Sequence, residues 1–528
     1  MSGSPFPVRN RPFAEAPEDF VARLTAMHGL EGRLSFTAFL RRTAERRLDH
    51  TALVVDQRTL SYGALFAAID DAAAWLVHEA RLVPGRRAAL MIGNSEHYLI
   101  WYLAMLAAGI VAVPLNTKLV GREVAFQLTD SEAQLVVTES THLAVVEAAE
   151  AEAGIAPRHF LVDRETPPAG NHDMPPVPKI TADAAVYYTS GTTGRPKGVI
   201  LDHRGMIFMA LQGTLCNEYD DPGLVFLSMM PLFHIASHVL TLPVLHVGGT
   251  AVIETYATER MLAVIAGRGV NCFFAVPSML LMMAGSAERH EHDLSGIRVI
   301  QYGAAPMATE RMDEIRALFL NAHFVHNMGQ TESVGLITSL DSARARDKNG
   351  SIGVAIPGGR RRVVDAADQD VAPGTVGELI SQGPNMMRGY LNNPDASAET
   401  LRGGWLHTGD LGYLDDDGFL YLVDRQKDMI IRGGENIYST EVEDVLYMHP
   451  GVGLAAVVGA PNELFGEEVV AFLQPAEGVS QSADDEITAH CRRHLASFKV
   501  PVKLVWLDDF PLTATGKIQK HELKRLLD

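Results

Sequence analysis

The sequence predicts an α/β chain with buried parallel sheets, followed by an antiparallel region and a smaller C-terminal βα unit. Between residues 53 and 277, short apolar or β-branched runs alternate with helical stretches. From about residue 350, short strands with turn signals follow one another, and after residue 424 a new βα pattern runs to residue 528. Apolar strands separated by helices are typical of parallel sheets, whereas closely spaced strands and turns favour an antiparallel or barrel-like region.

Each strand and helix expected before residue 277 is predicted by the pattern of its own residues. Short apolar runs predict strands at 87–93, 109–115, 133–139, 224–230, 250–254 and 271–277, and amphipathic stretches predict helices at 62–79 and 259–267. Residues 157–179 are rich in proline and polar side chains, which predicts a surface connection. Residues 98–115 form an uncharged stretch, but Gly109 and Pro114 interrupt it. We expect a buried helix that ends near Gly109 and a short strand after it, instead of a membrane span.

The later elements are read from turn residues. Asp415–Gly418 predicts a hairpin turn; a calcium loop is the weaker alternative because no glutamate stands at its twelfth position. The change of pattern at 424–427 predicts a boundary between an N-terminal domain, 1–424, and a C-terminal domain, 428–528. The amino terminus has no apolar run, so no signal peptide is expected.

Composition excludes several classes of protein. Lys and Arg number 45 against 64 Asp and Glu, a net charge of −19, which disfavours nucleic acid as a partner. The three cysteines, Cys216, Cys272 and Cys491, lie far apart, which is typical of a reduced compartment such as the cytoplasm and excludes a cysteine-based zinc site. The 528 residues are enough to bury a large core without disulfides or metal.

The strongest chemical signal is the segment from Tyr188 to Gly198, YTSGTTGRPKG, which follows an apolar run. Its glycines let backbone N–H groups approach an anion, its hydroxyls add donors, and Lys197 adds a positive charge. The loop suits a polyphosphate. It is not a Walker A loop, because no Ser or Thr follows the lysine. The alternative is a Gly/Thr-rich turn that binds nothing.

Six further motifs accompany this loop: PLFHIAS (231–237), YGAAP (302–306), MGQTES (328–333), WLHTGD (405–410), DRQKDMIIRGGENIYSTEVE (424–443) and PLTATGKIQK (511–520). With it, they resemble the adenylate-forming superfamily of acyl-CoA synthetases, adenylation domains and beetle luciferases, from about residue 30 to the end. The resemblance implies a large N-terminal domain of stacked α/β sheets with a β-barrel-like subdomain, and a small mobile α+β C-terminal domain. It also implies ATP, Mg²⁺ and coenzyme A as cofactor and co-substrates, and a homodimer is plausible by analogy only.

The resemblance implies a role for each site residue. Lys517 resembles the catalytic lysine that stabilises charge as a carboxylate approaches the α-phosphate; a surface lysine is the alternative. Glu332 resembles the magnesium-binding acid. His234 resembles a gate at the carboxylate end of the acyl pocket, with a core histidine as the alternative. Thr193 completes the catalytic set. The residues expected at ATP or AMP are Thr189, Ser190, Gly191, Thr192, Gly194, Lys197, Gly303, Ala304, Ala305, Met328, Gly329, Gln330, Thr331, Asp410 and Arg425.

Three of these nucleotide residues need separate comment. Asp410 is expected at the ribose hydroxyls, because one carboxylate can accept from a vicinal diol. Arg425 is expected near ribose and phosphate, and an ion pair at the domain boundary is the alternative. Met328 stands where the family usually has an aromatic residue on adenine, and a thioether packs on a ring more loosely.

The acyl pocket implied by the resemblance is mostly apolar. Its expected liners are Ile235, Ala236, Ser237, Phe274, Tyr302, Asn327, Val334 and Gly335. No Lys or Arg among them can pair a second carboxylate, and no acid can pair an amine, which favours an aliphatic or aromatic monocarboxylate. Gly335 leaves room at the inner end, which favours an acid larger than acetate.

The sequence therefore predicts an AMP-forming acyl-CoA synthetase. Lys427 occupies the hinge position of the family, and Gly433 and Gly434 resemble the loop along the pantetheine path. The alternatives are a stand-alone enzyme that loads a carrier protein with a carboxylic or amino acid, and a relative that keeps the fold without catalysis.

Overall fold

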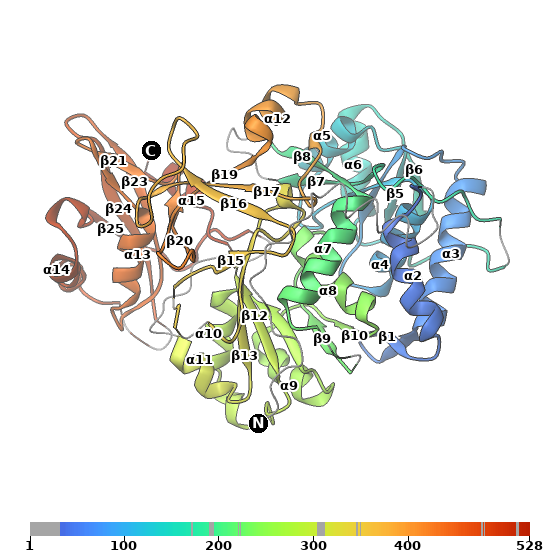
Figure 1. The fold of residues 1–528 in the computed structure, drawn as a ribbon, viewed down its shortest axis with the longest axis horizontal. Coiled ribbons are helices and arrows are strands. Elements are labelled where there is room, and N and C mark those ends of the chain that lie inside the picture. Colours follow the sequence, from blue (N-terminus) through green and yellow to red (C-terminus); the bar gives the residue numbers. More distant parts are fainter. Residues whose placement is uncertain are drawn as a thin grey trace.

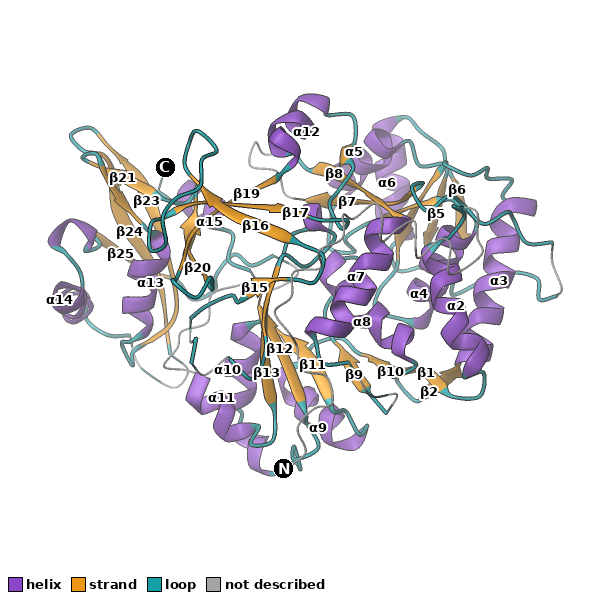
Figure 2. Cartoon of the chain, viewed as in Figure 1, coloured by secondary structure: helices purple, strands orange, loops and turns teal. Residues whose placement is uncertain are grey.

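The computed structural model describes residues 32–170, 173–189, 195–219, 221, 223–303, 312–344, 347–348, 350–476, 479, 481–513 and 517–527. These residues form four sheets, with helices on both sides of the first two (Figure 1). In Figure 2 the first helices and strands, from α2 to α8, lie at the right of the molecule, and the elements after β20 lie at the left.

The first sheet has seven strands in the order β18-β8-β7-β4-β3-β5-β6. Their bounds are β3 Arg87–Met91, β4 Val111–Pro114, β5 Leu135–Thr138, β6 Arg158–Leu161, β7 Asp183–Thr189, β8 Lys197–Asp202 and β18 Gly389–Tyr390. The central strands pair in parallel and are buried on both faces, whereas β8 pairs antiparallel with β7 and β18. The expected surface connection at 157–179 is wrong at its start, because 158–161 pair with β5 as an edge strand.

The second sheet has nine strands in the order β15-β14-β13-β12-β11-β9-β10-β1-β2. Their bounds are β1 Thr51–Val55, β2 Arg58–Ser61, β9 Val225–Ser228, β10 Thr250–Ile253, β11 Cys272–Ala275, β12 Val299–Gly303, β13 His323–Met328, β14 Thr338–Leu340 and β15 Val354–Ala355. The strands from β1 through β10, β9, β11 and β12 to β13 run parallel. The six strands expected from apolar runs are thus confirmed as β3, β4, β5, β9, β10 and β11.

Five helices fill the space between these two sheets: α2 Phe36–Arg46, α3 Tyr62–His78, α4 Glu96–Ala107, α7 His203–Cys216 and α8 Ile235–Val247. Their apolar side chains share one buried cluster with residues of both sheets, which explains the expected stacking of α/β layers. The outer face of the first sheet is covered by α5 Gly121–Ser131 and α6 Leu143–Ala153. The outer face of the second sheet is covered by α9 Thr258–Gly267, α10 Pro277–Gly285 and α11 Met312–Leu318.

The segment 98–115 behaves as expected. Helix α4 ends at Ala107, Gly109 has a positive φ of 71°, and β4 follows at Val111. Every residue from Tyr98 to Leu106 is buried against neighbouring protein. Of the helices that the structure describes, none has both the length and the apolar surface needed to cross a bilayer.

The third sheet is antiparallel, in the order β16-β17-β19-β20, with bounds Arg360–Val364, Gly377–Gln382, Leu406–Leu414 and Leu420–Arg425. Helix α12, Pro394–Thr400, stands before β19. The expected hairpin turn at 415–418 joins β19 to β20, and the Asp415 carboxylate accepts from the N–H groups of Asp417 and Phe419. The antiparallel region expected after residue 350 takes this form.

The last part of the chain forms a fourth sheet, in the order β22-β21-β24-β23, with β25 beside β24. Its strands are β21 Ile430–Arg432, β22 Glu435–Ile437, β23 Val452–Asn462, β24 Gly466–Pro475 and β25 Lys503–Trp506, and its helices are α13 Ser439–Tyr447, α14 Asp484–His494 and α15 Lys520–Arg525. Since β20 ends at Arg425 and β21 begins at Ile430, the predicted hinge at 424–427 lies where one sheet gives way to the next.

Candidate active site

The predicted nucleotide residues lie at the ends of strands. Thr189 ends β7 and Lys197 begins β8, opposite each other in the antiparallel pair, so the phosphate loop is the connection between these strands. Gly303 ends β12 and Met328 ends β13, and Gly329 follows. The carboxyl ends of parallel strands are the usual ligand-binding edge of an α/β sheet. Ser190, Gly191, Thr192, Thr193, Gly194, Ala304 and Ala305 lie outside the described residues.

Glu332 and Lys197 are linked through a tyrosine that the sequence did not single out. The hydroxyl of Tyr390 donates to Oε1 of Glu332 at 2.9 Å, and the Lys197 ammonium lies 4.9 Å from the centre of the Tyr390 ring. Tyr390 reaches this position because β18 pairs with β8 directly after the phosphate loop. Burial and the Glu332 carboxylate raise the pKa of Tyr390, so its hydroxyl stays protonated and donates.

Asp410 and Arg425 face each other on β19 and β20. Nε of Arg425 donates to Oδ1 of Asp410 at 2.7 Å, and Nε2 of Gln330 donates to Oδ2 at 2.7 Å. Asp410 is 6% exposed, and its two partners fix the orientation of its carboxylate. The ion pair weighed for Arg425 is therefore present, and its partner is the proposed ribose-binding carboxylate itself.

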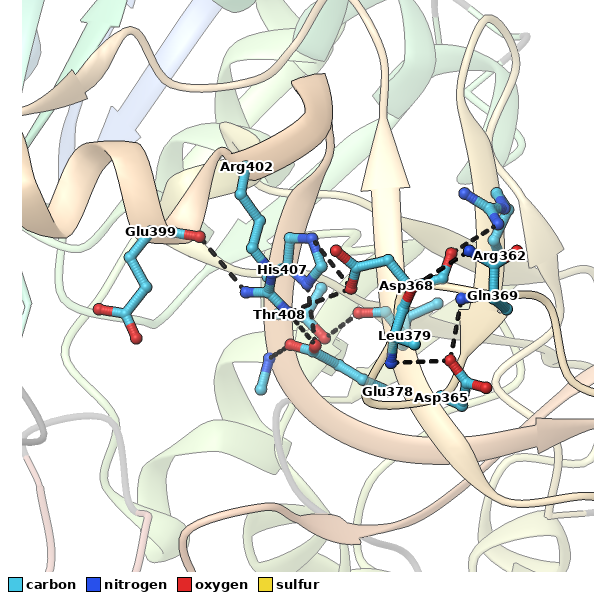
Figure 3. Close-up of polar contacts among 12 residues, drawn as sticks. Arg362, Asp365, Asp368, Gln369, Glu378, Leu379, Glu399, Arg402, His407 and Thr408 are labelled. Carbon is cyan, nitrogen blue, oxygen red and sulfur yellow. Dashed lines mark hydrogen bonds and ion pairs between the residues drawn. The ribbon is translucent and has the colours of Figure 1, made fainter.

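A polar network stabilises the strand that carries Asp410 (Figure 3). The hydroxyl of Thr408 donates to the carbonyl of Leu379 at 2.7 Å, and the backbone N–H of Asp410 donates to the Thr408 hydroxyl at 3.1 Å. Glu378 accepts from Gly409 N–H at 3.1 Å and lies 2.8 Å from Nδ1 of His407. These bonds fix the backbone from His407 to the N–H of Asp410.

Lys517 lies within electrostatic reach of this pair, although it comes from the far end of the chain. Its loop is closed by an antiparallel bridge between Leu512 and Ile518, and its backbone N–H donates to the Thr513 hydroxyl at 3.0 Å. The residue is exposed as a whole. The protein around its ammonium and the positive charge of Arg425 nevertheless lower the pKa of Lys517, while Asp410 opposes this shift.

His234 is the N-cap residue of helix α8. Its Nδ1 accepts from the N–H of Ala236 at 3.2 Å, so a neutral ring carries its proton on Nε2. Burial and the nearby positive charge of Lys517 lower the pKa of His234 to about 4, which makes the neutral ring the dominant form above that pH. The structure thus places His234 near Lys517, at the boundary of the site.

The expected acyl-pocket residues do not all face the same space. Phe274 and Asn327 point to the side of the second sheet that α8 covers. Tyr302 points to the opposite face and stacks on His326, with 4.4 Å between ring centres, because neighbouring residues of a strand alternate between faces. This placement corrects the expectation that Tyr302 and Phe274 line one pocket. Ile235, Ala236 and Ser237 form the first turn of α8, and the Ser237 hydroxyl donates to the carbonyl of Pro231.

The room expected beside Gly335 is already filled. A Cβ atom at Gly335 would lie 2.1 Å from Cγ2 of Val239, so α8 packs directly on this glycine. The space that the absent Gly335 side chain leaves is therefore occupied by Val239 of α8, and not left open as expected. Val334 has a φ of 49°, which a β-branched residue rarely adopts. Such strain is concentrated at functional sites.

Two polar side chains, Asn327 and Asn217, lie beside the apolar cluster between α8 and the second sheet. Nδ2 of Asn327 donates to Oδ1 of Asn217 at 2.7 Å, and both side chains are buried. Within the described part of the chain, Oδ1 of Asn327 has no hydrogen-bond partner. Met328 is 9% exposed and packs in the core between the sheets, so little of its thioether faces an adenine site.

The two glycines predicted for the pantetheine path form the turn between β21 and β22. Gly433 and Gly434 have positive φ values of 60° and 88°, as a two-residue hairpin turn of this type requires. A Cβ atom at Gly434 would meet no atom within 4 Å. Lys427 lies in the connection before β21 and adds to the positive charge around Lys517.

Together, the fold and the site define a nucleotide-dependent enzyme, and comparison with known proteins gives its family. The pattern of the family described as AMP-binding enzyme matches residues 40–391, and that of the AMP-binding enzyme C-terminal domain matches residues 441–517. The chain belongs to the AMP-binding enzymes, which confirms the resemblance seen in its motifs.

Particular relatives narrow the comparison. The chain is 37% identical to a feruloyl-CoA synthase from Amycolatopsis over 84% of this chain and 89% of that protein. It is 36% identical to a fatty acid–[acyl-carrier-protein] ligase from Streptomyces coeruleorubidus, over 90% of this chain and 92% of that protein. The o-succinylbenzoate CoA synthetase of Bacillus subtilis, solved with its acyl-adenylate intermediate, has a TM-score of 0.83 at 31% identity, covering 92% of this chain and 97% of its own.

Proposed function

We propose that this protein is an AMP-forming acyl-CoA synthetase. A substrate carboxylate attacks the α-phosphate of ATP, giving an acyl-adenylate and pyrophosphate. The thiol of coenzyme A then attacks the acyl carbonyl, the thioester forms, and AMP leaves. The relatives named as CoA ligases support this proposal, as does a solved relative that carries an acyl-adenylate.

The observation that carries the proposal is the position of Lys517. The charges of Asp410 and Arg425 shift the pKa of Lys517, and the charge of Lys517 lowers the pKa of His234. Lys517 is far in sequence from Asp410, Arg425 and His234, which themselves lie at β19, β20 and the start of α8. The first reaction brings two anions together, the carboxylate and the α-phosphate. A positive charge between them stabilises the charge that develops in the transition state.

The other residues support binding of ATP. The Asp410 carboxylate, oriented by Gln330 and Arg425, suits the ribose hydroxyls. Lys197 suits the phosphates. Glu332 fits as a protein ligand for Mg²⁺, which is typically held by one or two carboxylates together with substrate phosphates and would there offset phosphate charge. Within the described residues, no group of three or more potential protein ligands forms a separate metal site.

The acid we propose is an aliphatic or aromatic monocarboxylate. The side chains between α8 and the second sheet, where the acyl group is expected, are mainly apolar, and Val239 fills the space beside Gly335. The neutral ring of His234 can donate from Nε2 to a carboxylate oxygen without adding charge.

A carrier-protein thiol is the second candidate acceptor. The fatty acid–[acyl-carrier-protein] ligase among the relatives favours it, since that protein is about as similar to this chain as the feruloyl-CoA synthase is. Free coenzyme A remains the first choice because several relatives are named as CoA ligases.

A pyrophosphate-release screen tests the proposal. Purified protein, ATP and Mg²⁺ are incubated with a panel of aliphatic and aromatic acids, with and without coenzyme A. We expect release with some monocarboxylates and multiple turnovers only when coenzyme A is added. Turnover only with an acylatable carrier protein would establish the second candidate, and no release with any acid would contradict both.

Glu332→Gln should weaken the binding of Mg²⁺ that the adenylation step requires. A neutral amide is a poorer ligand for a hard dication than a carboxylate, so we expect the magnesium concentration at half-maximal rate to rise. The amide can still accept from Tyr390, which keeps the local fold. A magnesium titration of single-turnover pyrophosphate release measures this, and an unchanged titration and rate would remove Glu332 from the metal site.

Two finer statements belong to the same proposal. The scattered free cysteines favour the cytoplasm, where thiols stay reduced. A homodimer is proposed by analogy with the family, and light scattering of the purified protein would test it.

A further inference from the structure

A buried polar chain connects the predicted hinge to the helix that follows Lys517. Asp424, the residue before Arg425 on β20, is 6% exposed. Its carboxylate accepts from the backbone N–H and the hydroxyl of Ser439, the first residue of α13, and from the N–H of Arg425 at 2.7 Å. At this end of α13 the Asp424 carboxylate thus satisfies the first N–H of the helix, and its negative charge suits the positive end of the helix dipole.

Lys520 completes the chain from the other side. Its ammonium donates to the Ser439 hydroxyl at 2.6 Å and pairs with Oε1 of Glu443 at 2.7 Å. The same Glu443 oxygen accepts from the N–H of Val457 on β23 at 2.7 Å. Although burial by itself lowers it, the negative charge of Glu443 raises the pKa of Lys520, so this lysine stays charged.

The network is three residues away from Lys517. Between them, the backbone N–H of Gln519 donates to the carbonyl of Pro511 at 2.8 Å, and its side chain donates to the carbonyl of Leu512 at 2.9 Å. The loop that carries Lys517 is thus tied at its base to α15, and α15 is tied through Lys520 to α13 and β20. Asp424 and Arg425 are adjacent, so the chain ends next to the residue whose charge acts on Lys517.

We propose that Lys520 is a positioning residue for the adenylation step. Through Ser439 and Glu443 it holds the Lys517 loop in register with β20, which carries Arg425 beside Asp410 of β19. This inference rests on the proposed function. It adds a role that the motif around Lys517 does not itself require, since Lys520 contacts neither Asp410 nor Arg425 in any hydrogen bond or ion pair found among the described residues.

Lys520→Met tests this inference by separating the two half-reactions. Displacing a catalytic group by about 1 Å can cost on the order of 10²-fold in rate, so we expect single-turnover adenylation to fall by about 10- to 100-fold. The KM for ATP should change little, because the variant leaves Asp410, Gln330 and Lys197 in place. Thioester formation from supplied acyl-adenylate and coenzyme A, which does not need the charge of Lys517 near the α-phosphate, should be far less affected.

Three further variants make the result specific. Lys520→Arg keeps the charge and should restore much of the adenylation rate. Arg525→Met, at an exposed cation of the same helix paired with Glu522, should behave as wild type. If Lys520→Met does not fold because Glu443 is left buried without its partner, the double variant Lys520→Met/Glu443→Gln removes both charges and should show the same selective loss.

Hydrogen exchange gives a readout that does not depend on activity. In Lys520→Met the amides of Lys517 and Gln519 should lose protection, whereas those of α14 should keep it. Equal loss in both half-reactions, or normal adenylation with unchanged exchange at Lys517 and Gln519, would overturn the inference. Wild-type protein that adenylates no acid would contradict the proposed function instead, and the exchange measurement would still decide whether Lys520 holds the loop.

Discussion

Lys517→Ala should nearly abolish acyl-adenylate formation and leave the fold intact. The residue as a whole is exposed, and the charges of Asp410 and Arg425 act on its ammonium, so we expect it to contribute to a transition state and not to the core. Loss of one such electrostatic contact costs on the order of 10²–10³ in rate. Single-turnover pyrophosphate release measures this loss, with the melting temperature as the check on folding.

The second half-reaction is the control for Lys517. The variant should still convert synthetic acyl-adenylate and coenzyme A to thioester at a substantial rate. Lys503→Ala, at an exposed lysine of β25 in the same part of the chain, should leave both half-reactions unchanged. Equal losses in the two half-reactions would show that Lys517 has a shared or structural role.

Gly434→Leu should block transfer to coenzyme A and spare adenylation. If the thiol arm passes this turn, a branched side chain would hold the thiol short of the acyl carbonyl, and about 1 Å of misplacement can cost on the order of 10²-fold in rate. Acyl-adenylate should then accumulate, and added coenzyme A should barely discharge it. Quenched-flow measurement of both half-reactions separates the two effects.

Gly434→Ala is the matched control, because any side chain at this position is strained. The φ of 88° penalises Ala and Leu alike, whereas only Leu adds bulk in the open space around the turn. We expect Ala to be mild and Leu to be severe, with the damage confined to thioester formation. Equal defects in Ala and Leu would mean that backbone strain, and not the path of the thiol arm, explains the glycine.

Much of the fold could be predicted because its parallel strands are short, apolar and flanked by helices. The runs at 87–93 and 271–277, for example, are apolar on both faces, and both faces are buried only in a sheet that helices cover on each side. These runs contain β3 and β11. The order of the strands could not be predicted. Strand β1 pairs with β10, about two hundred residues later, and no local pattern encodes such a partner.

The candidate site shows the same division. Motifs predict Glu332, Asp410 and Lys517 as site residues, because their neighbours in sequence are distinctive. Tyr390 and Lys520 could not be predicted, since each contacts partners that only the tertiary structure brings near. The space at Gly335 was misjudged for the same reason, because Val239 on another element fills it.

The most direct test of the account follows the oxygen atoms of the substrate. An acid that the protein activates is labelled with ¹⁸O in its carboxylate and incubated with the protein, ATP, Mg²⁺ and coenzyme A. Mass spectrometry then measures the ¹⁸O content of each product. Attack of the carboxylate on the α-phosphate predicts one labelled oxygen in AMP, unlabelled pyrophosphate and a thioester that keeps the other labelled oxygen. Label in pyrophosphate or phosphate, or formation of ADP in place of AMP, would contradict the proposed chemistry.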